Sequence, residues 1–143
     1  MNKPRLLKLA GLLEADAKNK NGIKFDLSTW GMDVSGKNQD IGVHCGTAAC
    51  AMGLAALSGE FRRQGLTYKI HDGGVLWPAE VWVAYKNESG LDAAVGLFDI
   101  SFEESEWLFT PQHYDHPNVT GAKGELIVAK RIRNFVAGKA RPT

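Results

Sequence analysis

Residues 44–59 read His-Cys-Gly-Thr-Ala-Ala-Cys-Ala-Met-Gly-Leu-Ala-Ala-Leu-Ser-Gly, and this stretch decides how the rest of the chain is arranged. We expect a helix from Thr47 to about Ser58, with one apolar face turned toward the core. The Thr47 hydroxyl is expected to accept a hydrogen bond from an early helical amide. The inward stripe would consist of four residues at offsets of three, four and seven, namely Cys50, Gly53, Leu54 and Leu57.

Gly53 is the most informative residue of this predicted helix. A glycine inside a helix costs about 1 kcal/mol relative to alanine. Its place on the inward stripe therefore predicts that another backbone passes close to it.

Apolar periodicity predicts more helices on both sides of this stretch. Residues 4–17 begin with Pro4, which suits a first helical turn, and carry an apolar stripe. A helix is expected around residues 91–98, and Ser101 with Glu104 forms a capping box that opens another. A last helix is expected over residues 123–137.

Residues 67–70 and 81–85 are β-branched and aromatic, and His71-Asp72-Gly73-Gly74 between them is typical of a turn, so a small hairpin is predicted. Residues 75–86 leave an alternative, because Pro78-Ala79-Glu80 can also open a helix. Residues 19–40 are polar and glycine-rich, which predicts a loop anchored by the short segment 25–30.

Length and composition predict one soluble domain. The chain has 143 residues, of which 44% are hydrophobic and 23% charged, the profile of a globular domain. The predicted fold is a mainly α, α+β domain over residues 1–143, with about five helices and a small hairpin. No apolar run approaches the ~18 residues of a membrane span, and the N-terminus lacks a signal-peptide pattern. We therefore expect a cytoplasmic protein with no membrane partner.

Residues 25–30, Phe-Asp-Leu-Ser-Thr-Trp, together with residues 44–53, resemble a family of small uncharacterised proteins from bacterial and phage genomes. That family carries a Cys-Gly-Thr-x-x-Cys-x-x-Gly core, and weaker echoes occur at residues 108–109 and 129–132. The resemblance implies a mostly helical fold and a phage or mobile-element connection, and it transfers no mechanism. It marks a structural motif made of Trp30, Cys45, Gly46, Thr47, Cys50 and Gly53.

Cys45 and Cys50 are the first residues to test for chemistry. Five residues apart on a helix they would point about 140° apart, too divergent for an easy disulfide. Cys50, on the apolar stripe, is expected to be a core residue. Cys45 would precede a helix N-terminus, which favours a thiolate. It is a weak candidate nucleophile if His44, His113 or His116 lies within reach, and otherwise a structural thiol.

His113-Tyr114-Asp115-His116 places two imidazoles and a carboxylate within four residues. Such a cluster binds zinc only when another ligand, for example Cys45, completes the set. Because no second ligand pair accompanies it, a polar surface loop is the preferred interpretation. No metal and no cofactor are predicted.

Charge is distributed unevenly along the chain. Residues 1–20 carry +3, residues 21–120 carry −7 and residues 121–143 carry +5. The basic ends either complement the acidic middle or share a face that attracts phosphate. Lys130, Arg131 and Arg133 of the last helix are candidate nucleic-acid contacts, although no recognised DNA- or RNA-binding signature accompanies them.

These observations favour a non-enzymatic accessory or binding protein that works through its outer surface, with a protein partner or a second copy of itself. Two alternatives stay open. One is a thiol-dependent hydrolase that uses Cys45, and the other is a weak nucleic-acid-binding protein that uses the basic last helix.

Overall fold

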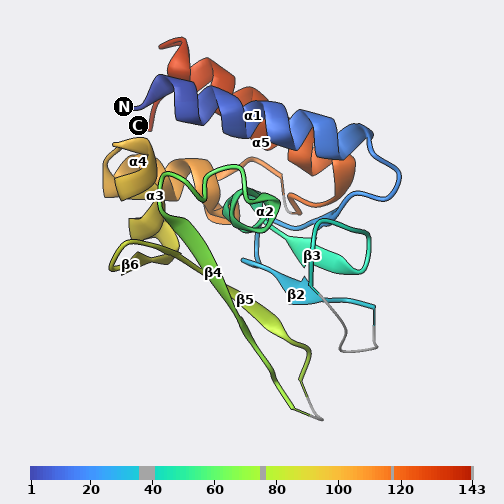
Figure 1. Cartoon of the computed structure of the whole chain (residues 1–143). Helices are drawn as coiled ribbons and strands as arrows, with labels where there is room; N and C mark the ends of the chain where they lie inside the picture. The colour runs from blue at the N-terminus through green and yellow to red at the C-terminus, as the bar shows by residue number, and fades with distance from the viewer. Residues whose placement is uncertain (36–40, 75–76, 117, 143) are drawn as a thin grey trace.

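The computed structural model (Figure 1) describes residues 1–35, 41–74, 77–116 and 118–142. The predicted mainly α, α+β fold is confirmed: the described residues form five α-helices and a mixed sheet. The helices are α1 (Lys3–Lys18), α2 (Ala51–Ser58), α3 (Gly90–Phe98), α4 (Phe102–Phe109) and α5 (Gly121–Val136), and a short 3-10 turn, η1, covers Pro111–His113.

The sheet is larger than the predicted hairpin. Its strands are β1 (Lys24–Phe25), β2 (Met32–Asp33), β3 (Thr47–Ala49), β4 (Leu66–His71), β5 (Glu80–Tyr85) and β6 (Glu88–Ser89). Their order is β1-β3-β2-β5-β4, with β6 also paired to β5, and only β1 and β3 run parallel. In Figure 1 the β4–β5 hairpin extends away from the helices as an arm.

The hairpin prediction is confirmed, with Thr67 opposite Ala84 and Ile70 opposite Val81. The alternative helix opened by Pro78-Ala79-Glu80 is wrong, because residues 80–85 form a strand whose side chains alternate between exposed and buried positions. Residues 75–76, which belonged to that open question, lie outside the described residues. The predicted loop over residues 19–40 contains the short strands β1 and β2, and residues 36–40 are also outside the described part.

The predicted helix start at Thr47 is wrong. Residues 47–49 form the buried strand β3, which pairs with β1 on one side and β2 on the other. The Thr47 hydroxyl accepts a hydrogen bond from the Gly42 backbone amide rather than from a helical amide. Pairing with two strands outweighs the helix propensity of the alanines, which amounts to only a few tenths of a kcal/mol per residue. The helix begins at Ala51, after Cys50 has taken an extended conformation.

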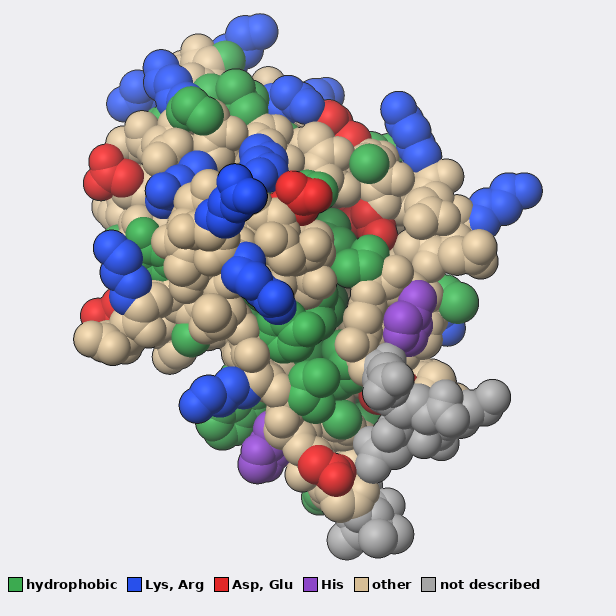
Figure 2. Space-filling view, viewed as in Figure 1, with side chains coloured by type: hydrophobic (Ala, Val, Ile, Leu, Met, Phe, Trp, Pro, Cys, Tyr) green, Lys and Arg blue, Asp and Glu red, His purple; other side chains and the backbone are tan. Residues whose placement is uncertain are grey.

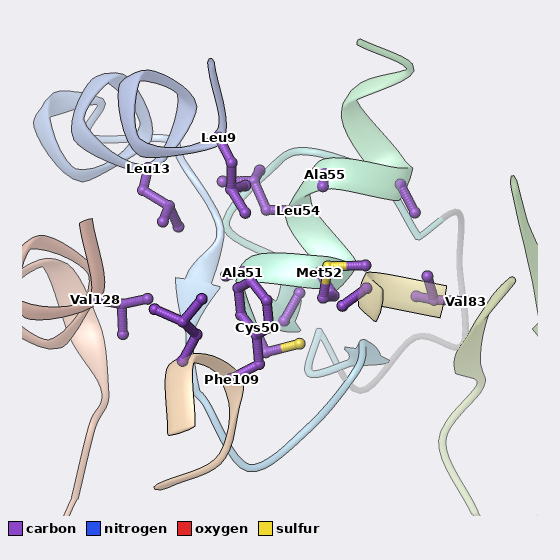
Figure 3. Close-up of a cluster of buried hydrophobic side chains, with 14 of the residues drawn as sticks. Leu9, Leu13, Cys50, Ala51, Met52, Leu54, Ala55, Val83, Phe109 and Val128 are labelled. Carbon is purple, nitrogen blue, oxygen red and sulfur yellow. The ribbon is translucent and has the colours of Figure 1, made fainter. Parts of the chain in front are cut away.

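The two terminal helices lie side by side and cover the core (Figure 1). Leu9 and Leu13 of α1 and Val128 of α5 point toward the buried helix α2, as Figure 3 shows. Every residue from Ala51 to Ala56 is buried, so α2 is enclosed on all sides rather than amphipathic.

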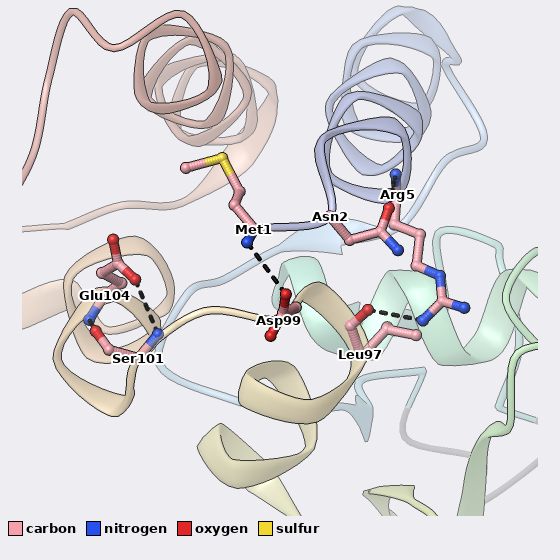
Figure 4. A network of polar contacts seen from close by, with 7 residues as sticks. All are labelled: Met1, Asn2, Arg5, Leu97, Asp99, Ser101 and Glu104. Atoms are coloured by element: carbon pink, nitrogen blue, oxygen red, sulfur yellow. Dashed lines mark hydrogen bonds and ion pairs between the residues drawn. The ribbon is translucent and has the colours of Figure 1, made fainter.

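Polar contacts hold the N-terminus against α3 (Figure 4). The N-terminal ammonium lies 3.3 Å from a carboxylate oxygen of Asp99, and the Arg5 guanidinium donates to the Leu97 carbonyl oxygen at 2.9 Å. Next to them, Ser101 and Glu104 form the predicted capping box of α4. In the described part of the chain, none of the helices has the length and apolar character needed to cross a bilayer.

Candidate functional site

The two motif stretches of the sequence meet in the fold. Strand β1 runs parallel to β3, and the Asp26 backbone amide donates to the Ala49 carbonyl oxygen at 3.0 Å. The backbone amide of the next residue, Cys50, donates to the Thr29 carbonyl oxygen at 2.8 Å. These bonds attach residues 25–30 to the start of α2 and so fix the position of Trp30.

Gly53 is the point of closest approach between the two stretches. A β-carbon built on Gly53 would lie 1.7 Å from the carbonyl oxygen of Trp30. Real β-carbons do not approach an oxygen so closely, and only glycine leaves room for this backbone. The prediction that another backbone passes Gly53 is confirmed, and Trp30 supplies it.

Trp30 forms a wall of two pockets. The first pocket has a volume of about 220 Å³. Its walls come from the loop after β1, the starts of α2 and α3, and the end of α4. The ten lining residues are Leu27, Ser28, Thr29, Trp30, Cys50, Leu91, Phe109, Thr110, Pro111 and Gln112. Figure 3 shows Cys50 and Phe109 close together beneath the buried cluster. This pocket therefore opens beside residues of both motif stretches.

The second pocket lies on the other side of Trp30, toward the hairpin. It has a volume of about 290 Å³ and is lined by Trp30, Trp82, Val83, Ser89 and Gly90. Trp82 projects from the exposed face of β5 and is 58% exposed, and its indole stacks on the His71 imidazole with ring centroids 5.1 Å apart. Two indoles thus border one hollow.

Among the described residues, neither lining contains a carboxylate, a lysine, an arginine or a histidine. Cys50, which does line the first pocket, is 2% exposed, and burial raises the pKa of its thiol to about 11. Its sulfur accepts a hydrogen bond from the Gly53 amide at 3.4 Å and so caps α2. The thiol is therefore neutral near pH 7.

Cys45 is not at a helix N-terminus, because α2 begins six residues later. It is an exposed free thiol, so it does not hold neighbouring elements together as the structural interpretation expected. The adjacent His44 uses its Nδ1 to accept a hydrogen bond from the Gly46 amide at 3.0 Å. Among the described residues, no imidazole is hydrogen-bonded to the Cys45 sulfur.

The histidines of the 113–116 cluster are both exposed, and the His113 carbonyl oxygen accepts a bond from Arg131. Within the described ranges, no group of three or more His, Cys, Asp or Glu side chains is arranged to hold a metal ion. The expected polar surface loop describes only part of the cluster: His113 ends the 3-10 turn η1, and Tyr114 is buried and donates to the Leu108 carbonyl oxygen at 2.7 Å.

The three candidate nucleic-acid contacts of α5 have different surroundings. Lys130 is exposed. Arg133 makes a bidentate ion pair with Glu14 at 2.7 and 2.8 Å, which lowers the pKa of that carboxyl. Arg131 donates to the carbonyl oxygens of Trp107 and His113 and lies over the rings of Trp107 and Tyr114. Arg131 and Arg133 are therefore both engaged in contacts within the chain, and the ion pair of Arg133 lies at the surface.

Sequence reasoning missed Trp82 and the residues of α3 and α4 that complete the pockets. A signal for Trp82 existed in Val81-Trp82-Val83, because alternation along a strand places the tryptophan on the face opposite two buried valines. Leu91 and Phe109 carried no such signal, since both belong to ordinary apolar helical stripes.

The chain was compared with known proteins. No protein-family model, no curated protein and no solved structure matches it.

Proposed function

We propose that this chain is a non-enzymatic accessory protein that binds another protein at the two pockets beside Trp30. The observation that carries the proposal is that both motif stretches fix Trp30 between the pockets. Gly53 leaves room for the Trp30 carbonyl oxygen. The Cys50 amide donates to the carbonyl oxygen of Thr29, the residue before Trp30, and the Cys50 sulfur caps α2. The motif that resembles bacterial and phage proteins then has a purpose, which is to build a binding surface. A phage or mobile-element origin is part of the proposal and rests on that resemblance.

The composition of the pockets supports binding over catalysis. Their walls are aromatic and aliphatic, with a few neutral polar groups, and a pocket of this kind orients a ligand without supplying an acid or a base. The exposed Cys45 lies outside both linings. It also fits a cytoplasmic location, where thiols stay reduced.

The arm beside the second pocket supports a protein partner. Trp82 is 58% exposed and stands on the face of β5 that borders the second pocket, and Figure 2 shows hydrophobic side chains continuing from the centre of the visible face toward the arm. Tryptophan is enriched among the residues that dominate binding energy at protein interfaces.

Selection from a random peptide library displayed on phage tests the proposal. We expect the wild-type chain to enrich sequences that Trp82→Ala does not retain, because position 82 is largely exposed and its truncation leaves the core intact. Trp77→Ala, which removes an exposed tryptophan outside both linings, is the matched control and should retain them. No enrichment by the wild type, or equal retention by Trp82→Ala, would refute the proposal.

A second candidate, nucleic-acid binding, is favoured by one observation. Helices α1 and α5 lie side by side, so the +3 and +5 segments share one layer of the molecule, and Figure 2 shows lysine and arginine side chains spread over the part of this face that lies above the arm. Binding through that layer predicts an affinity for duplex or single-stranded DNA or RNA that falls steeply with salt. Lys130→Glu should weaken it further, and no binding at low salt removes the candidate.

A further inference from the structure

We propose that the segment bound beside Trp30 is a proline-rich stretch of the partner in the polyproline II conformation, with prolyl rings seated in the two pockets. This inference rests on the proposed function and names the class of partner. It follows from the shape, the charge and the hydrogen-bonding groups of the two linings.

The aromatic walls suit prolyl rings. Trp30 separates the pockets, Trp82 borders one and Phe109 borders the other. Proline-rich segments dock into grooves lined by aromatic side chains, and they lose little entropy on binding because the polyproline helix is already formed when they are free. The Trp30 indole, with a pocket on each side, therefore offers two binding positions for prolyl rings.

The neutral walls disfavour charged anchors. In the part of the chain that the structure describes, no carboxylate, lysine, arginine or histidine lines either pocket. A charged side chain placed there would lose hydration without gaining a partner, which is costly. The electrostatic complement of this surface is therefore an uncharged segment, and prolyl and alanyl residues satisfy that requirement.

Hydrogen bonding points the same way. A polyproline helix has no internal hydrogen bonds, so its carbonyl oxygens need donors on the surface that binds it. Two lining hydroxyls are already used, since Ser28 donates to Asp26 and Thr110 donates to Glu106. The side chains of Thr29, Ser89 and Gln112 make no hydrogen bond within the described part of the chain.

Those three side chains and the indole N–H groups of Trp30 and Trp82 are therefore neutral donors available to a ligand. They belong to both pockets, so a bound segment that spans Trp30 would find a donor on each side. This pairing of aromatic seats with neutral donors is what distinguishes the surface from a plain apolar patch.

Titration with a synthetic peptide of about four Ala-Pro-Pro repeats, followed through the indole N–H signals of the four tryptophans, tests the inference. We expect the Trp30 and Trp82 signals to shift while those of Trp77 and Trp107 stay in place. Trp82→Ala should weaken binding by about tenfold or more, as loss of a dominant interface residue does, and Trp77→Ala should leave the affinity within about twofold of the wild-type value. A peptide of equal length made of Ala-Gly-Ser repeats should cause no shift.

Three results would overturn the inference. The first is no shift at millimolar Ala-Pro-Pro peptide, and the second is a shift confined to Trp77 or Trp107. The third is a peptide-free shift of the Trp30 and Trp82 signals with protein concentration, because a second copy would then occupy the pockets. If the displayed library yields Trp82-dependent sequences that lack proline, the proposed function survives and this inference fails. If it yields no Trp82-dependent sequence, the proposed function fails as well.

Discussion

The carbonyl oxygen of Trp30 occupies the place where a side chain of residue 53 would begin. A β-carbon at Gly53 would lie 1.7 Å from that oxygen and 3.0 Å from the Ala49 β-carbon. The contact joins the loop after β1 to the first turns of α2, so the conformation of Trp30 and the residue type at position 53 depend on each other.

We expect Gly53→Ala to destabilise the protein by about 1–3 kcal/mol, the range typical of overpacked cores. This reverses the usual effect of replacing a helical glycine with alanine, which stabilises by up to about 1 kcal/mol. Gly11→Ala in α1 is the matched control, because a β-carbon there meets nothing within 4 Å and should stabilise. Urea unfolding of both variants gives the comparison, and a stabilised Gly53→Ala would contradict the reported approach of Trp30.

The start of α2 shows where sequence patterns reach their limit. Gly53 could be predicted to meet a backbone because its cost inside a helix is a local property. The displacement of the helix start from Thr47 to Ala51 could not be predicted, because it depends on strand pairing with residues 24–25 and 32–33. Those partners are short strands with no sequence signal of their own, and Cys50 is an uncommon cap.

The buried carboxyl pair between the terminal helices was predictable in part. Glu125 precedes Val128 and Ile132 by three and seven residues, and Asp16 follows Leu13 by three, so each acid lies on the apolar stripe of its helix. Glu125 is 1% exposed. Its Oε2 and the Oδ2 of Asp16 have no hydrogen-bond partner in the described part of the chain. The contact between the two acids depends on how α1 packs against α5, and no local sequence pattern predicts that packing.

This pair makes the stability of the protein depend on pH. Burial, together with the neighbouring Asp16 carboxyl, raises the pKa of Glu125 from 4.5 to about 9. The folded protein therefore keeps a proton that the unfolded chain releases above its lower pKa. The contribution of Glu125 to stability should be fully present below about pH 4.5 and be lost as the pH rises from about 5 to about 9, by up to about 1.4 kcal/mol per unit.

Glu125→Gln should remove most of that slope and be more stable than the wild type at pH 8, since a neutral amide needs no proton. Glu103→Gln, at an exposed position in the first turn of α4, should leave the slope between pH 6 and 9 unchanged. Urea unfolding at several pH values measures each slope. A flat wild-type profile from pH 6 to 9, or equal slopes in the wild type and Glu125→Gln, would count against the buried proton.

The two thiols should separate by reactivity. Cys50 is buried with a raised pKa and Cys45 is exposed, and the thiolate is the reactive form. We expect a maleimide to label one thiol per native molecule, at Cys45, and to reach Cys50 only after unfolding. Mass spectrometry of labelled peptides identifies the site. Labelling of both thiols in the native protein at similar rates would contradict the buried position of Cys50.

The same experiment addresses the hydrolase alternative. Cys45 should react at the rate of a free cysteine in a short peptide, because no imidazole is bonded to its sulfur among the described residues. A rate that exceeds this peptide value by about tenfold or more at neutral pH, and that drops on His44→Ala, would instead support an activated nucleophile.

The candidate site was less predictable than the fold for a physical reason. The periodicity of neighbouring residues predicts a helix or a hairpin, whereas a pocket is formed by segments that are distant in sequence. Trp30 and Cys50 came from a motif, but Leu91, Phe109 and Trp82 come from α3, α4 and β5.

Arg131 packs against two aromatic rings. It was a candidate nucleic-acid contact, yet its guanidinium is 3.6 Å from the ring centroid of Tyr114 and 4.5 Å from that of Trp107. It also donates to two carbonyl oxygens at 2.8 Å, and these join α5 to α4 and η1. Long basic side chains often cover apolar surface in this way. The residue therefore contributes to stability as a bridge between elements.

We expect Arg131→Ala to destabilise by about 2–3 kcal/mol, because it loses the ring contacts and leaves two carbonyls without their donor. Arg131→Lys should recover only part of this, since an ammonium cannot reproduce the planar stacking. Lys130→Ala, at the exposed neighbouring position, should stay within about 0.5 kcal/mol of the wild type. Thermal or urea unfolding measures the stability of the three variants. Equal stability of Arg131→Ala and Lys130→Ala would show that Arg131 does not stabilise the fold and is free to bind an outside ligand.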